Sequence, residues 1–175
     1  MKQALLVIDV QRGLFEPAPH EGEAVIERIN RLADRARDAG VPVVYIQHET
    51  RQGALAHGSA GWQLAEGLQA RETDHLVRKT TPDSFLRTDL AEKLSAWGVE
   101  QVVICGYACE FCVDTTTRRA AALGYPVILV ADAHTTHDKP HMSGEQIRAH
   151  HNATLPNISS FGVKISAVPA DDVVW

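Results

Sequence analysis

The chain has 175 residues, of which 45% are apolar and 22% are charged, proportions that are ordinary for one soluble globular domain. Its net charge of -5 argues against nucleic acid and anionic membranes as partners, because both attract basic surfaces. No run reaches the roughly 18 apolar residues of a membrane span, and the apolar stretch before Asp9 is too short for a signal peptide. We therefore predict a single domain over residues 1–175, located in the cytoplasm, with neither a membrane nor a nucleic acid as partner.

Apolar runs and helical periodicities alternate along the chain. Residues 4–9 form a continuous apolar run that ends in a carboxylate, as a buried parallel strand does. Residues 22–39 follow with apolar side chains at helical spacing, and Gly40 ends that helix. The further elements expected, in chain order, are a strand at 41–47, an irregular segment at 48–73 with a short helix around 62–69, a strand at 75–79, a helix at 88–98, a strand at 101–106, a helix at 112–123, a strand at 125–132, a helix from Ser143 to about 155, and a strand at 163–166.

This alternation of strands and helices predicts an α/β fold, with a doubly wound parallel sheet between two layers of helices. Such folds bind ligands outside the carboxyl ends of their strands. The residues that directly follow each strand are therefore the candidates for a functional site. They are Asp9, His48 with Glu49, Lys79, residues 106–112 and residues 132–137.

Cys109 and Cys112 form a CxxC motif after the fourth strand, and such a motif has three interpretations. A redox pair is disfavoured because the acidic residue between the thiols does not stabilise a thiolate. A zinc site would combine the two cysteines with His134 and His137, which are suitable ligand types. The two pairs are much further apart than the roughly 12 residues of a zinc finger, although both loops would reach the same edge of the sheet.

The third interpretation makes Cys112 a nucleophile in the first turn of a helix. Free N–H groups and the helix dipole stabilise a thiolate there, which predicts a depressed pKa for this cysteine. The same N–H groups are suited to hold an oxyanion during acyl transfer. Lys79 would add a favourable positive charge, and Asp9 would accept and return a proton. The convergence of these three residue types at one sheet edge favours this interpretation.

Three segments together resemble the isochorismatase-like cysteine hydrolases. They are IDVQRGLF at residues 8–15, VRKTTPDSF at residues 77–85, and the segment that begins GYACEFCVDTT and covers residues 106–133. The similarity extends from about residue 3 to about residue 155. That family includes nicotinamidases, N-carbamoylsarcosine amidohydrolase and isochorismatase itself. The resemblance implies a Rossmann-like sheet with strand order 3-2-1-4-5-6.

The resemblance also implies a role for each matching residue. Asp9 would be the general base, Lys79 the cation beside the thiolate, and Cys112 the nucleophile. A cis peptide between Tyr107 and Ala108 would turn the Ala108 N–H inward, where it forms an oxyanion hole with the N–H of Cys112. Gln11 and Phe15 match residues that line the pocket in relatives. Tyr107 is expected to contact substrate as well, and Trp62 and Phe111 are further candidates for the pocket wall.

Two departures from the family pattern refine this expectation. Position 109 is commonly Thr in relatives, so Cys109 is interpreted as a local replacement, which weakens the redox and zinc alternatives. The Asp of the nicotinamidase metal site is missing after the second strand, where Gln47, His48 and Glu49 stand. We therefore expect no metal and no other cofactor.

The predicted activity is hydrolysis of a C–N bond, in an amide or a related group, through a thioacyl intermediate on Cys112. The alternatives are an isochorismatase-type vinyl-ether hydrolase and a CxxC redox or metal-binding protein. Residues 48–73 are expected to select the substrate, because long irregular segments at the active edge of a sheet commonly do so. The expected partners are a small-molecule substrate and further copies of the chain, in a homodimer or a homotetramer, as in relatives.

Overall fold

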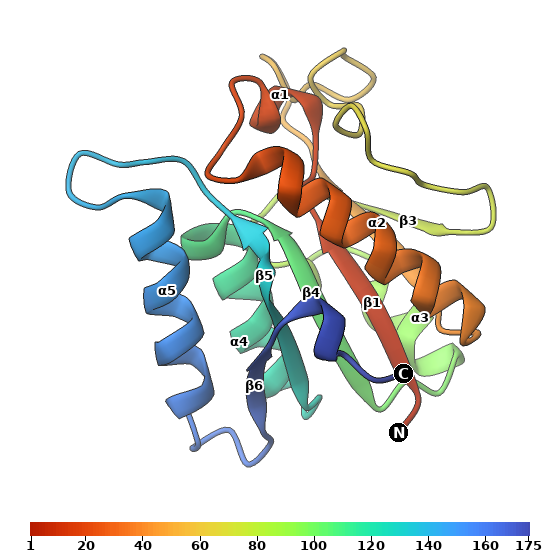
Figure 1. Ribbon diagram of the computed structural model, residues 1–175. Coiled ribbons are helices and arrows are strands. Elements are labelled where there is room, and N and C mark those ends of the chain that lie inside the picture. The colour runs from red at the N-terminus through yellow and green to blue at the C-terminus, as the bar shows by residue number, and fades with distance from the viewer.

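A computed structural model describes all 175 residues and contains one sheet of six strands (Figure 1). The strands are β1 (Gln3–Ile8), β2 (Val43–His48), β3 (His75–Lys79), β4 (Gln101–Tyr107), β5 (Val127–Thr135) and β6 (Ile165–Val168). They lie in the order β3-β2-β1-β4-β5-β6, and all neighbouring pairs are parallel. The predicted doubly wound α/β fold and its strand order are therefore confirmed.

The helices and helical turns occupy the connections between the strands, apart from the last turn, which follows β6. They are α1 (Arg12–Phe15), α2 (Gly22–Asp38), α3 (Leu90–Ala96), the π-helical turn η1 (Cys109–Val113), α4 (Asp114–Ala122), α5 (Gly144–Thr154), and the short 3-10 turns η2 (Leu155–Asn157) and η3 (Ala170–Asp172). The expected capping box between Ser143 and Gln146 opens α5. None of these helices has the length and apolar composition needed to cross a membrane.

Side chains that alternate along the strands create one apolar core on each face of the sheet. In β1, Leu6 and Ile8 belong to the core shared with α3 and α4, whereas Leu5 and Val7 belong to the core shared with α2. Figure 1 shows α2 lying across the near face of the sheet. With both faces covered in this way, the carboxyl ends of the strands are the edge at which polar side chains can gather.

The short helix expected around residues 62–69 does not form. Leu64 instead makes an antiparallel bridge with Gln11, just after β1. The carbonyl group of Trp62 accepts hydrogen bonds from the side chains of Gln11 and Gln47, both at 2.9 Å. Backbone groups that bond to a neighbouring segment in this way are not available for a helix. Residues 62–69 therefore form a non-helical segment, here called the strap, that is hydrogen-bonded to the residues after β1.

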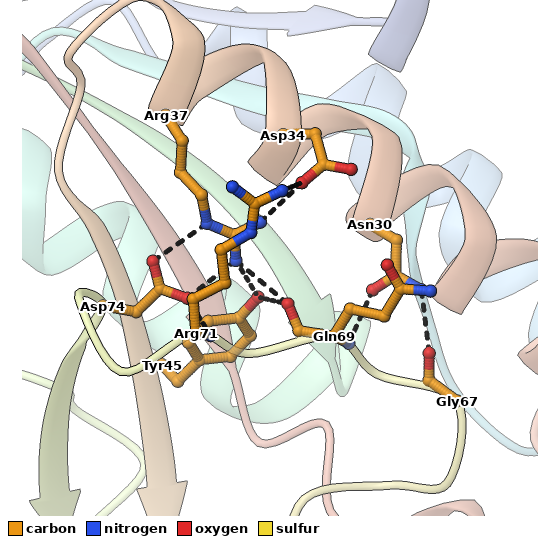
Figure 2. A network of polar contacts seen from close by, with 8 residues as sticks. All are labelled: Asn30, Asp34, Arg37, Tyr45, Gly67, Gln69, Arg71 and Asp74. Carbon is orange, nitrogen blue, oxygen red and sulfur yellow. Dashed lines mark hydrogen bonds and ion pairs between the residues drawn. The ribbon is translucent and has the colours of Figure 1, made fainter.

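A polar network fixes the end of the irregular segment to α2 (Figure 2). Arg37 on α2 donates from Nε and Nη2 to the two carboxylate oxygens of Asp74, at 3.0 and 2.7 Å. It also donates to Asp34 at 2.8 Å and to the carbonyl group of Gln69 at 3.0 Å. Asn30, about two turns before Arg37 on α2, accepts from the Gln69 N–H at 2.9 Å. The segment that leads into β3 is thus anchored by side chains of α2.

Asp74→Asn is expected to destabilise the protein and to weaken its response to acid. Burial opposes the charge of Asp74, but its hydrogen bonds from Arg37 and from the Arg71 N–H lower its pKa overall. Stability from such a group is present above the unfolded pKa of about 3.9 and is lost as pH falls through the lower folded value. We expect the variant to lose about 1–3 kcal/mol at neutral pH, measured by urea unfolding.

Asp89→Asn provides the matched control for this measurement. The Asp89 side chain is 59% exposed and pairs with Lys93 on the surface of α3. Exposed pairs contribute roughly 0–1 kcal/mol, so this variant should follow the wild-type protein at every pH. If Asp74→Asn loses stability toward acid as steeply as the wild-type protein, Asp74 is not the group responsible.

Candidate active site

Three of the predicted side chains meet at the carboxyl edge of the sheet. Lys79, the last residue of β3, places Nζ 2.8 Å from Asp9 Oδ2 and 3.3 Å from Cys112 Sγ. The side chains of Lys79 and Asp9 are 0% and 2% exposed, and Cys112 is half-buried in η1. A carboxylate, an ammonium group and a thiol are therefore in direct contact, largely out of water.

The backbone around β1 explains how Asp9 reaches this position. Asp9 has a φ of 52°, in the left-handed region that Asp tolerates better than most residues. Its neighbour Ile8 lies opposite Gly106 of β4, and a Cβ atom at Gly106 would lie 2.1 Å from the Ile8 carbonyl oxygen. Only glycine allows this close approach of β4 to β1, which brings the segment with Cys112 beside Asp9.

The peptide bond between Tyr107 and Ala108 is cis, as the family resemblance implies. The Ala108 carbonyl group begins η1 by accepting from the N–H groups of Phe111 and Val113, at 3.0 and 3.1 Å. The Ala108 N–H makes no hydrogen bond of its own to the backbone. An oxyanion hole requires N–H donors that are not already hydrogen-bonded, and the Ala108 N–H meets this requirement. Its role in an oxyanion hole stays a prediction.

A cavity of about 190 Å³ opens above these groups. Its lining consists of Asp9, Leu14, His48, Leu55, Tyr107, Ala108, Phe111 and Cys112. A larger hollow of about 490 Å³, at the amino end of the strands beside Trp97, contains none of the predicted site residues. The small cavity is therefore the candidate active site, and Tyr107, which the sequence singled out for substrate contact, belongs to its wall.

Gln11 and Phe15, the other two residues expected to contact substrate, do not line the cavity. The Gln11 amide is buried and bonds both the N–H and the carbonyl group of His48, at 2.9 Å each. The Phe15 ring packs against Tyr107 with ring centroids 5.8 Å apart. The structure thus places the two residues behind the cavity wall, where they support His48 and Tyr107.

His48, a candidate because it follows the second predicted strand, contacts Lys79, and the sequence did not reveal this contact. It lies opposite Lys79 in the parallel register of β2 and β3, and its Nδ1 is 3.2 Å from Lys79 Nζ. Burial lowers the pKa of His48, and the charge of Lys79 lowers it further. Because an ammonium group has only donors, Nδ1 accepts and the imidazole proton resides on Nε2.

The surroundings of Cys112 hold its thiol in the protonated form. Burial raises the pKa of Cys112 to about 12, the charge of Asp9 adds to this effect, and Lys79 opposes it. The depressed pKa of Cys112 expected from the helix N-terminus is therefore wrong. Asp9 Oδ1 is buried beside this thiol and has no hydrogen-bond partner, so one carboxylate oxygen is available as a proton acceptor.

The same donor atoms do not suit a metal ion. An Asp9 oxygen, a His48 nitrogen and Cys112 Sγ lie within 4.8 Å of one another, which is close enough for shared coordination. The Lys79 ammonium group, however, lies within 3.3 Å of all three residues. A fixed positive charge already occupies the centre of the donor set, where a cation would be repelled.

Cys109 of the CxxC motif has a partner away from the cavity. Its Sγ lies 2.9 Å from His134 Nδ1, and His134 Nε2 lies 2.8 Å from Asn152 Oδ1. The Asn152 amide nitrogen donates to the Ala131 carbonyl group, so its oxygen is the acceptor for His134. Nδ1 is then unprotonated, and the thiol donates to it. Burial raises the pKa of Cys109 and lowers that of His134 to about 4, so both are neutral.

This arrangement bears on the zinc and redox interpretations of the motif. His137 bonds to the Tyr107 hydroxyl at 2.7 Å and to the Pro17 carbonyl group at 2.8 Å, so it does not join His134 and the cysteines in a cluster. All three cysteines are free thiols. The predicted zinc alternative therefore has no gathered ligand set, and the two thiols of the motif have different partners.

Cys109→Ser is expected to keep most of the stability that Cys109→Ala loses. A serine hydroxyl can donate to His134 as the thiol does, whereas alanine leaves the buried Nδ1 without a donor. That loss should destabilise the protein by about 1–3 kcal/mol in urea unfolding. Equal destabilisation by the two substitutions would mean that packing of the sulfur, and not its hydrogen bond, is what matters.

Comparison with known proteins agrees with the resemblance read from the motifs. The family model of the isochorismatase domain matches residues 3–163. Two streptothricin hydrolases of Streptomyces noursei are 42% and 38% identical over 79% and 81% of this chain. The matches cover 51% and 58% of those proteins, so the chain spans little more than half of their length.

Two further matches cover most of both chains. YddQ of Bacillus subtilis, an uncharacterized isochorismatase family protein, is 35% identical over 78% of this chain and 79% of its own length. A crystal structure of an isochorismatase family protein has a TM-score of 0.87 at 33% identity, covering 95% of this chain and 98% of that one. On these matches, and on the fold and the site that accompany them, the chain belongs to the isochorismatase family.

Proposed function

We propose that the chain is a cysteine hydrolase that cleaves a C–N bond, in an amide or a related group, of a small neutral molecule. The observation behind the proposal is Lys79 Nζ, 2.8 Å from Asp9 and 3.3 Å from Cys112 beneath a cavity. Membership of the isochorismatase family and the two relatives named streptothricin hydrolases support hydrolysis as the reaction type. Nucleophilic catalysis by a thiol requires a nearby base to remove its proton, and a nearby cation stabilises the thiolate that forms.

In the proposed acylation, Asp9 Oδ1 takes the thiol proton of Cys112 and the sulfur attacks the carbonyl carbon of the substrate. A C–S bond forms, the carbonyl π electrons move to oxygen, and the N–H groups of Ala108 and Cys112 stabilise the oxyanion. The oxyanion then collapses, the carbonyl group re-forms and the C–N bond breaks. Asp9 returns its proton to the leaving nitrogen, which gives a free amine and a thioester on Cys112.

Deacylation uses the same groups with water as the nucleophile. Water attacks the thioester carbonyl while Asp9 accepts one of its protons. The new oxyanion collapses, the C–S bond breaks and the carboxylic acid leaves, after which the Cys112 sulfur recovers the proton from Asp9. Lys79 stays protonated and stabilises whichever of Asp9 and Cys112 is negatively charged.

The cavity lining favours an uncharged substrate over an anionic one. Its volume of about 190 Å³ is below the roughly 300–1,000 Å³ of pockets for drug-sized ligands, which suits a small molecule. None of the lining residues is arginine or lysine. Isochorismate has two carboxylates, and burying charges without partners costs several kcal/mol per ion. C–N hydrolysis is therefore preferred to the vinyl-ether alternative.

The proposal is tested with a panel of neutral amides and lactams, assayed for release of the amine, and streptothricin, for which two relatives are named, is assayed beside the panel as a basic compound. We expect turnover of at least one neutral compound and slower turnover of its analogue with a carboxylate. Intact-protein mass should reveal an acyl adduct on the wild-type chain that is absent from Cys112→Ala. Hydrolysis of isochorismate by Cys112→Ala at the wild-type rate would overturn the proposal in favour of the vinyl-ether reaction.

A further inference from the structure

The ammonium group of Lys79 has more acceptors around it than it has protons. Four acceptors lie within reach of Nζ, and they are Asp9 Oδ2 at 2.8 Å, the Thr81 carbonyl oxygen at 3.1 Å, His48 Nδ1 at 3.2 Å and Cys112 Sγ at 3.3 Å. An ammonium group has three protons. The carboxylate and the backbone carbonyl group are the two stronger and closer acceptors, so His48 and Cys112 compete for the third proton.

His48 is held as a competent acceptor by its surroundings. Gln11 fixes its backbone by bonding both its N–H and its carbonyl group at 2.9 Å. Burial and the charge of Lys79 keep the imidazole neutral near pH 7 by lowering its pKa, so the Nδ1 lone pair stays directed at the ammonium group. The charged groups that act on His48 are Lys79, Asp9, and Glu49 with its partner Arg78.

We propose that His48 is a positioning residue that controls the reactivity of Cys112 by competing with it for a proton of Lys79. While Cys112 is a thiol, the third ammonium proton is donated to His48. A thiolate is a much stronger acceptor than a thiol, so once it forms, the third ammonium proton turns from His48 to Cys112. The hydrogen bond to His48 therefore opposes thiolate formation, and the free protein keeps its nucleophile protonated. This inference rests on the proposed function, because it takes Cys112 as the nucleophile.

The test compares His48→Leu, which has no acceptor, with His48→Asn, whose side-chain oxygen can accept in place of Nδ1. Thiolate formation at Cys112 is followed by ultraviolet absorbance as a function of pH, after subtraction of the same protein with Cys112→Ser. We expect the midpoint of the leucine variant to fall by about one pH unit, which is about tenfold more thiolate at neutral pH. The asparagine variant should titrate like the wild-type protein.

Two results would overturn this inference. One is a leucine variant that titrates with the wild-type protein, and the other is an asparagine variant that shifts as far as the leucine variant. Urea unfolding checks that each variant is folded, and His48→Ala serves as a second variant without an acceptor. The titration needs no substrate, so its result is independent of the amide panel. If no acyl adduct forms on Cys112 in that panel, the proposed function fails even where the titration shows the predicted shift.

Discussion

Replacing Cys112 with serine is expected to abolish hydrolysis while leaving the folded structure unchanged. The sulfur is the atom that forms the thioester, and a serine hydroxyl is far less acidic than a thiol, so Asp9 cannot deprotonate it to a useful extent. Removal of the nucleophile from other covalent hydrolases lowers kcat by on the order of 10⁴- to 10⁶-fold. The measurement is the rate of amine release from a substrate identified in the amide panel.

Cys109→Ser is the control for this experiment, because it changes the other thiol of the same motif. Its hydroxyl retains the hydrogen bond to His134, on the side away from the cavity, so activity should stay within about threefold of the wild-type value. A redox pair predicts instead that both serine variants lose activity. Loss of activity in both, with unfolding curves unchanged, would therefore reject the hydrolase mechanism.

Lys79→Met should remove activity and also destabilise the protein strongly. Lys79 and Asp9 form an ion pair whose side chains are 0% and 2% exposed. Removing the ammonium group leaves the Asp9 carboxylate buried without its counter-charge, a change that costs about 3–5 kcal/mol in comparable pairs. The surface variant Lys93→Met, which breaks an exposed pair, should change stability by no more than about 1 kcal/mol.

The double variant Asp9→Asn with Lys79→Met separates the two effects. With neither charge present, no buried ion is left unpaired, so much of the stability lost in Lys79→Met should return. Activity should not return, because the proton acceptor is missing as well. Urea unfolding of the wild-type protein, of the single variants Asp9→Asn and Lys79→Met, and of the double variant gives the coupling energy of the pair. A coupling energy near zero would mean that the ion pair does not stabilise the folded state.

The regular parts of the fold were predictable because their causes are local. Continuous apolar runs specify strands that are buried on both faces, and helical spacing with Gly40 as a stop specified α2. The strap at residues 62–69 was not predictable, because its backbone bonds to Gln11 and Gln47 from other segments. Helix α1 has four residues, too few to show a periodicity.

The residues of the candidate site were likewise predictable from the sequence, whereas some of their contacts were not. Asp9, Lys79 and Cys112 were predictable because each follows or ends a strand, and the carboxyl ends of parallel strands meet at one edge. The contact between His48 and Lys79 depends on the register of β2 against β3, which apolar patterning alone does not specify. The raised pKa of Cys112 depends on how deeply the thiol is buried, and that is a property of the assembled fold.

The cavity also has a consequence for enzyme engineering. Three apolar side chains of its lining come from three separate segments, Leu14 in α1, Leu55 in the irregular segment and Phe111 in η1. These side chains have no polar atoms, whereas the floor around Lys79 is fixed by buried polar contacts. If the proposed function holds, combinatorial libraries at these three positions are expected to change the substrate scope while Asp9, Lys79 and Cys112 stay constant. The volumes of the side chains at these three positions would then determine which substrates fit the cavity.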